Sequence, residues 1–102
     1  MSGTVRVVVH HRAPEGEWTT VREAYDTISE QLEGTPGLLG NELLRSTLDP
    51  RSFAVLSRWK DLDAFTEWER GSGHRGTTSP LRRFQDRDRT PHFEVYEVDA
   101  AW

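Results

Sequence analysis

Residues 58–75 read RWKDLDAFTEWERGSGHR, and this stretch decides the fold because a strand end, a helix and a chain break follow one another in it. Trp59 ends the segment FAVLSRW, residues 53–59, which is expected to form a strand. Asp61 is a residue type that caps helix N-termini, and the amphipathic sequence behind it predicts a helix. The Gly-Ser-Gly sequence at 71–73 ends that helix.

The predicted helix, Asp61–Arg70, presents large apolar side chains on one face. Leu62, Phe65 and Trp68 stand three residues apart and therefore share this face. The face has to cover apolar surface, and Trp59 lies close to it in the sequence. Two interpretations stay open: the rings wall a pocket for a flat, apolar molecule, or they are ordinary core aromatics.

The rest of the chain supplies further strands and one longer helix. In the first strand, Val5, Val7, Val9 and His11 alternate with residues of the other face. The expected elements are strands at 4–12, 38–48, 53–59 and 92–98, and helices at 17–33 and 61–70. This βαββαβ order predicts an α+β, ferredoxin-like fold with a four-stranded antiparallel sheet.

One face of this sheet is expected to lack a cover. Both helices can pack on the face that carries Val5 and His11, whereas Val8 points to the opposite side. The sequence contains no third layer for that side. Uncovered apolar sheet surface is typical of a contact with a second copy of the chain, so the sequence predicts a homodimer.

Length and composition indicate one small domain. The chain has 102 residues, enough to bury roughly two-thirds of its unfolded surface. We expect a single domain over 1–102, with a charged surface loop at Gln85–Pro91 and a tail at Asp99–Trp102.

Several classes of function are not expected. Seventeen acidic and 13 basic residues give a formal charge of −4, which argues against a nucleic-acid partner. No stretch approaches the roughly 20 apolar residues of a membrane span, and the N-terminal sequence lacks a signal-peptide pattern. Cysteine is absent and the four histidines lack ligand spacing, so no metal site is expected. A cytoplasmic protein is the expectation.

Four segments together resemble the antibiotic-biosynthesis monooxygenase family. They are TPGLLGNELLR at 35–45, FAVLSRWKDLDAFTEW at 53–68, GHR at 73–75 and FEVYEV at 93–98. The resemblance covers roughly residues 4 to 98 and implies a small dimeric α+β barrel. The family includes cofactor-free oxygenases of aromatic polyketides, haem-degrading enzymes and members without assigned chemistry, so the resemblance leaves the activity open.

The cofactor-free oxygenases of this family line their substrate pocket with an asparagine, a tryptophan and a tyrosine. Trp59 matches the tryptophan at the end of the strand. Val55 stands at the asparagine position and Phe65 at the tyrosine position, so the chain departs from the pattern at both polar positions. The resemblance implies Trp59, Phe65 and Trp68 as substrate-binding side chains.

The haem-degrading branch uses a first-strand asparagine, a helix tryptophan and a later histidine around the haem. Trp68 matches the tryptophan. His11 stands at the asparagine position, and His74 lies closer to the tryptophan than the axial ligand usually does. The resemblance therefore implies His74 as the axial ligand if haem binds.

His74 and His11 are the candidate catalytic residues. An imidazole can act as a base at neutral pH or as an iron ligand, and His74 follows a glycine break from which it can turn toward a pocket. Its alternative is a surface histidine. His11 faces the helices and is either a pocket residue or a core histidine with a buried partner. Arg82 can bind a phenolate or propionate, or it can face solvent.

Three functions stay open. The first is a small oxygenase or tailoring enzyme of secondary metabolism that acts on a flat, polyketide-like aromatic without flavin or metal. The second is a haem-binding or haem-degrading monooxygenase that uses His74. The third is a non-catalytic dimeric domain that binds a small molecule.

Overall fold

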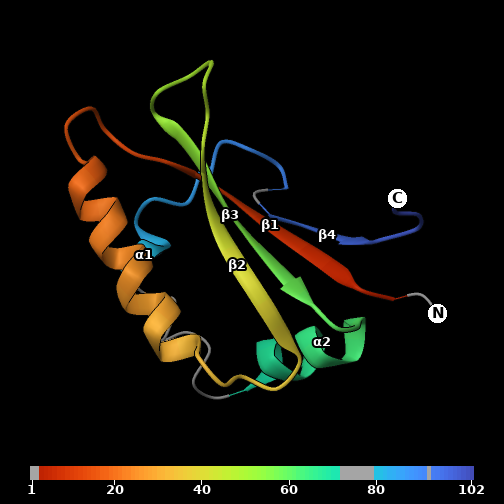
Figure 1. The fold of residues 1–102 in the computed structure, drawn as a ribbon. Coiled ribbons are helices and arrows are strands. Elements are labelled where there is room, and N and C mark those ends of the chain that lie inside the picture. The colour runs from red at the N-terminus through yellow and green to blue at the C-terminus, as the bar shows by residue number, and fades with distance from the viewer. Residues whose placement is uncertain (1–2, 72–79, 92) are drawn as a thin grey trace.

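The computed structural model describes residues 3–71, 80–91 and 93–102, and its elements follow the βαββαβ order (Figure 1). The elements are β1 (Val5–Arg12), α1 (Trp18–Leu32), β2 (Leu38–Arg45), β3 (Ser52–Trp59), α2 (Leu62–Arg70) and β4 (Phe93–Glu97). The strands form one antiparallel sheet in the order β2-β3-β1-β4. The predicted ferredoxin-like α+β fold is confirmed.

The register of the sheet decides which side chains share a face. In β1, Val9 pairs with Val55 and His11 pairs with Phe53 of β3. Along β2, Asn41 pairs with Ser57. Because side chains alternate between faces, these residues all project from the same side of the sheet, and the helices cover that side.

Two apolar clusters attach the helices to this face. In the first cluster, Val21 and Ile28 of α1 pack with Phe53 of β3. Two residues from the segment that follows α2 in the sequence, Leu81 and Phe84, complete this cluster. In the second, Phe65 of α2 packs with Trp59 and two valines of β1. Figure 1 shows α1 alongside the strands and α2 across their lower end, so the clusters lie at different ends of one sheet face.

The helix that the opening sequence predicts is present, with one correction. Asp61 caps α2, since its Oδ1 accepts a hydrogen bond of 2.8 Å from the backbone N–H of Ala64. Phe65 is buried, but Leu62 is 49% exposed. The expectation that Leu62 shares the buried face is wrong. A step of three residues falls about 60° short of a full helical turn, so Leu62 lies at the margin of the face that Phe65 buries.

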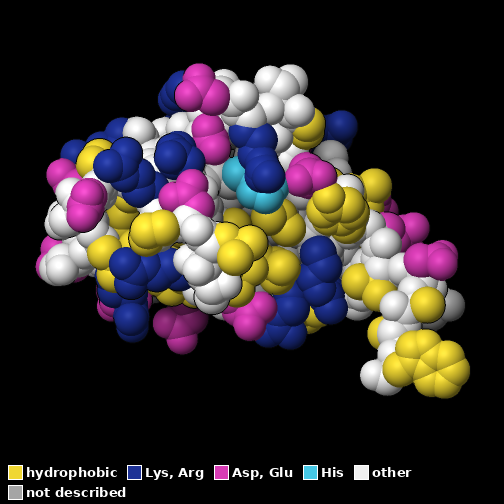
Figure 2. All heavy atoms as spheres, turned by 90° about the horizontal axis from the view of Figure 1, so that it is seen from above, with side chains coloured by type: hydrophobic (Ala, Val, Ile, Leu, Met, Phe, Trp, Pro, Cys, Tyr) yellow, Lys and Arg dark blue, Asp and Glu magenta, His cyan; other side chains and the backbone are white. Residues whose placement is uncertain are grey.

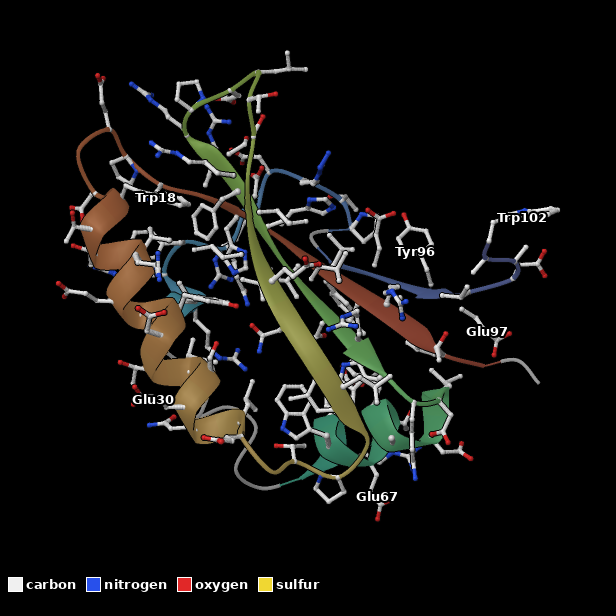
Figure 3. All side chains as sticks on the ribbon, viewed as in Figure 1. Trp18, Glu30, Glu67, Tyr96, Glu97 and Trp102 are labelled. Carbon is white, nitrogen blue, oxygen red and sulfur yellow. The ribbon has the colours of Figure 1, made fainter. Side chains whose placement is uncertain are left out.

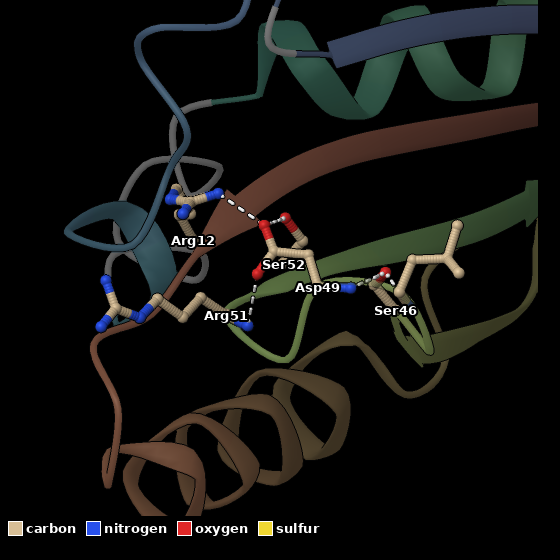
Figure 4. A network of polar contacts seen from close by, with 6 residues as sticks. Arg12, Ser46, Asp49, Arg51 and Ser52 are labelled. Atoms are coloured by element: carbon tan, nitrogen blue, oxygen red, sulfur yellow. Dashed lines mark hydrogen bonds and ion pairs between the residues drawn. The ribbon is translucent and has the colours of Figure 1, made fainter.

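The second strand is shorter than expected and ends at Arg45 because a hydrogen-bonded turn begins behind it. Ser46 Oγ accepts from the N–H of Asp49 at 3.0 Å. The Asp49 carboxylate in turn accepts from Arg12 Nη1 at 2.9 Å and from the N–H of Arg51 at 3.0 Å (Figure 4). These donors, the Arg51 N–H above all, hold the pKa of Asp49 below its usual value. The network ties the β2–β3 turn to the end of β1.

The other face of the sheet carries apolar side chains without a covering layer in this chain. Val8 and Leu56 are half-buried there, and Leu44 and Tyr96 are 41% and 51% exposed. Figure 2 shows apolar side chains gathered around a histidine and bordered by charged groups. Figure 3 shows Tyr96 on β4, well away from α1, and Trp102 at the far end of the tail.

A polar network borders this open face. Glu94 Oε1 accepts from His10 Nε2 at 2.9 Å, and Glu94 Oε2 accepts from the Tyr96 hydroxyl. Arg89 Nη1 lies 3.3 Å from His10 Nδ1. Because Tyr96 and then His10 donate to it, the pKa of Glu94 lies below its usual value. Among the described residues, no helix is long and apolar enough to cross a membrane.

Candidate functional site

A cavity of about 230 Å³ lies on the helix-covered face of the sheet, bounded by residues of both apolar clusters. Its walls come from β1, α1, β2, β3, α2, the chain around residues 81–85 and the start of β4. Five of the six candidate residues line it: His11, Trp59, Phe65, Trp68 and Arg82. The sixth, His74, lies outside the described residues.

Three rings form one wall of the cavity. Trp59 is 1% exposed, and its ring centroid lies 5.6 Å from Phe65 and 5.4 Å from Trp68. The Trp59 Nε1–H donates to Ser57 Oγ at 2.9 Å, which satisfies the buried indole. The rings therefore pack on one another as core residues and also line a cavity, so both interpretations of the sequence describe part of their role.

His11 is buried, with 4% of its surface exposed, and its ring orientation is fixed from two sides. The ring stacks on Phe53 at a centroid distance of 4.8 Å and an interplanar angle of 11°. His11 Nδ1 lies 2.9 Å from the carbonyl oxygen of Val9. A carbonyl oxygen only accepts, so Nδ1 carries the hydrogen and Nε2 of the neutral ring carries the lone pair.

Arg82 enters the cavity from a segment that β1 holds in place. Leu81 and Phe84 anchor this segment, since they are only 5% and 4% exposed. The Phe84 carbonyl accepts from the N–H of Arg12 at 2.6 Å, and Gln85 forms a β-bridge with His11. Gln85, which the sequence assigns to a surface loop, thus lines the cavity beside His11.

The guanidinium of Arg82 is incompletely paired. Its Nε is buried and has no hydrogen-bond partner within the described residues. Because Arg82 also lines the cavity, its positive charge would stabilise an anionic oxygen bound there. Together, His11 and Arg82 add a proton acceptor and a positive charge to the cavity that the three rings also line.

Sequence reasoning missed the polar residues that α1 and β2 contribute. Tyr25, Ser29 and Asn41 all line the cavity, and the Tyr25 hydroxyl donates to Asn41 Oδ1. Asn41 could have been found from the strand register, because it stands on the same face as His11. Glu69, an exposed residue of α2, also lines the cavity. No group of three or more potential metal ligands occurs in the described part of the chain.

Comparison with known proteins places this arrangement in a family context. Residues 4–78 match the family model described as antibiotic biosynthesis monooxygenase. SchA of Streptomyces halstedii is 26% identical over 80 residues, which are 78% of this chain and 21% of SchA. The chain thus spans about a fifth of the length of the curated relatives it matches.

Solved structures share the fold over nearly the whole chain. SnoaB, a cofactor-independent oxygenase from Streptomyces nogalater, superposes with a TM-score of 0.72 at 18% identity, covering 98% of this chain and 95% of SnoaB. A haem-degrading protein of Mycobacterium tuberculosis gives a TM-score of 0.72 at 19% identity, covering 99% of this chain and 96% of that protein. At these identities, the likeness shows the fold alone.

Replacing Trp59 with alanine tests whether the aromatic wall belongs to the core. We expect Trp59→Ala to lower the free energy of unfolding by about 3–5 kcal/mol, because a fully buried indole leaves a cavity. The matched control is Trp102→Ala, which removes a fully exposed ring and should change stability by less than about 0.5 kcal/mol. Urea unfolding of both variants measures the difference, and equal losses would contradict the assignment.

Proposed function

The chain belongs to the antibiotic biosynthesis monooxygenase family, and we propose that it is a small oxygenase that acts on a flat, polyketide-like aromatic without flavin or metal. The observation that carries this proposal is the cavity itself, which His11 and Arg82 line together with Trp59, Phe65 and Trp68. Flat ring systems fit an aromatic wall, and polar groups at one end fix their orientation.

The proposed reaction begins with a proton transfer. An electron-rich hydroxyaromatic or its keto tautomer gives a proton to Nε2 of His11, whose other nitrogen is held by the Val9 carbonyl. Arg82, which lines the same cavity, stabilises the resulting anion through the positive charge of its guanidinium. The chain contributes orientation, exclusion of water and stabilisation of charge at these two side chains.

The substrate anion supplies the electrons that reduce dioxygen. In the overall change, a ring CH₂ group and O₂ give a ring carbonyl and water. Two C–H bonds of that carbon are broken and a C=O bond to one oxygen atom forms. The other oxygen atom leaves as water with the two hydrogens. The substrate is the reductant, so the balance requires no further electron donor.

Oxygen uptake with anthrone as a model substrate tests this function. We expect chelator-treated protein without added flavin to consume one O₂ for each anthraquinone formed, at a rate above that of buffer. His11→Gln should lower kcat by about 100-fold or more, because it removes the base. The matched control is His10→Gln, since His10 lies on the opposite face and bonds to Glu94.

A rate equal to that of buffer, or equal rates for the two histidine variants, would contradict the proposal. The haem-based alternative is an outcome of the same experiment. A Soret band after addition of haem, and its change in His74→Ala, would favour that alternative and would identify His74 as the ligand.

We also propose that the chain acts as a homodimer formed through the open sheet face. Leu56 lies on that face in β3, one of the two middle strands, and pairs with Val8 of β1. Leu56→Lys should therefore convert the dimer into a monomer, because it places a charge in an apolar contact. Leu48→Lys, at a 95% exposed turn position, is the control and should stay dimeric.

Light scattering measures this directly. The dimer has twice the 11.7 kDa mass of the chain. A wild-type protein of 11.7 kDa at micromolar concentration, or a Leu56→Lys variant that stays dimeric, would argue against this interface.

A further inference from the structure

The cavity has a second polar end, and the proposed chemistry at His11 does not use it. Tyr25 and Ser29 stand four residues apart on α1, so both point to the same side of the helix. Their hydroxyls donate to one acceptor, Oδ1 of Asn41 on β2; the Ser29 bond measures 3.3 Å. All three residues line the cavity.

These two bonds fix the direction of the Asn41 amide. Since Oδ1 accepts from two hydroxyls, the Nδ2 atom with its two N–H groups occupies the other side of the side chain. No hydrogen bond from Asn41 Nδ2 occurs among the described residues. The hydroxyl of the neighbouring Ser57 accepts from Trp59 Nε1 and not from Asn41, and the side chains of Leu38 and Val55, which also line the cavity, offer no acceptor. The Asn41 N–H groups therefore have room for an acceptor that comes from a ligand.

The sheet register separates this end from His11. Asn41 pairs with Ser57, which pairs with Val7, whereas His11 lies four residues farther along β1. Four residues of strand span about 13 Å, and two strand spacings span about 10 Å, so the two Cα atoms lie roughly 16 Å apart. The polar ends thus lie apart along the cavity, with Val9 and Val55 between them in the register.

We propose that Asn41, oriented by Tyr25 and Ser29, is a specificity-determining residue that binds a carbonyl oxygen on the substrate. This proposal rests on the proposed function and names its substrate class. The substrate is an extended polycyclic hydroxyketone, with an acidic hydroxyl or its keto tautomer at the end near His11 and Arg82. Its ring carbonyl lies at the other end, where it accepts from Asn41 Nδ2. The two contacts together set which ring carbon faces the reacting end.

The test compares two probes that differ in the carbonyl groups. Hydroxyanthraquinone has them, and hydroxyanthracene has the same ring length without them. Quenching of tryptophan fluorescence gives the Kd of each probe. In Asn41→Leu, which replaces the amide by an apolar group of similar size, the Kd of hydroxyanthraquinone should rise about threefold to tenfold. The Kd of hydroxyanthracene should stay within about twofold of the wild-type value.

Two further variants separate recognition from structural support. Tyr25→Phe keeps the ring and removes one donor to Asn41 Oδ1, so it should weaken hydroxyanthraquinone binding in the same direction but less. Gln31→Leu removes an amide from an exposed position of α1 outside the cavity and should change neither Kd.

A Kd that rises equally for both probes in Asn41→Leu would overturn the proposal, because Asn41 would then serve only to tie β2 to α1. An unchanged Kd for hydroxyanthraquinone would overturn it as well. Either result is compatible with the proposed oxygenase function, provided that the wild-type protein still binds hydroxyanthracene and that its oxygen uptake with anthrone still depends on His11. Failure of the oxygen-uptake assay, in contrast, would remove the proposed function whatever the Asn41 variants show.

Discussion

The antiparallel pairing of β1 with β3 is the constraint on which the rest of the structure depends. This pairing sets Trp59 opposite Val5 and His11 opposite Phe53 on one face. At one end of that face, Trp59 packs with Phe65 of α2; at the other end, Phe53 packs with α1 and the segment around Leu81. A shift by one residue would turn every one of these side chains to the other face, so the register specifies the core and the cavity together.

The cavity exists because two helices cover one sheet at separate places. Each helix brings its own apolar cluster, and the space between the clusters is closed by side chains of intermediate burial such as Tyr25, Asn41 and Trp68. Polar groups in this space are held by neighbours: His11 by a backbone carbonyl, Asn41 by two hydroxyls. Because these side chains are already fixed, they need little reorganisation when a ligand binds, and this favours binding and chemistry in the cavity.

The sequence predicted the elements well because their signals are local. Alternation in the first strand, the Asp61 cap and the Gly71 stop act within a few residues, and the structure has each of them. The aromatic part of the cavity was also predictable, since Trp59, Phe65 and Trp68 are close in sequence. Asn41 and Tyr25 were not singled out, because their meeting depends on how α1 lies over β2.

A ligand site between the two apolar clusters is the central claim, and the indole N–H signals of the tryptophans in a proton–nitrogen NMR spectrum test it most directly. The chain has 4 tryptophans, of which Trp59 and Trp68 line the cavity while Trp18 and Trp102 do not. Titration with hydroxyanthracene should shift the signals of Trp59 and Trp68 and leave that of Trp102 unchanged. Shifts confined to Trp102, or no shift at Trp59 and Trp68 while the probe binds, would contradict a binding site in this cavity.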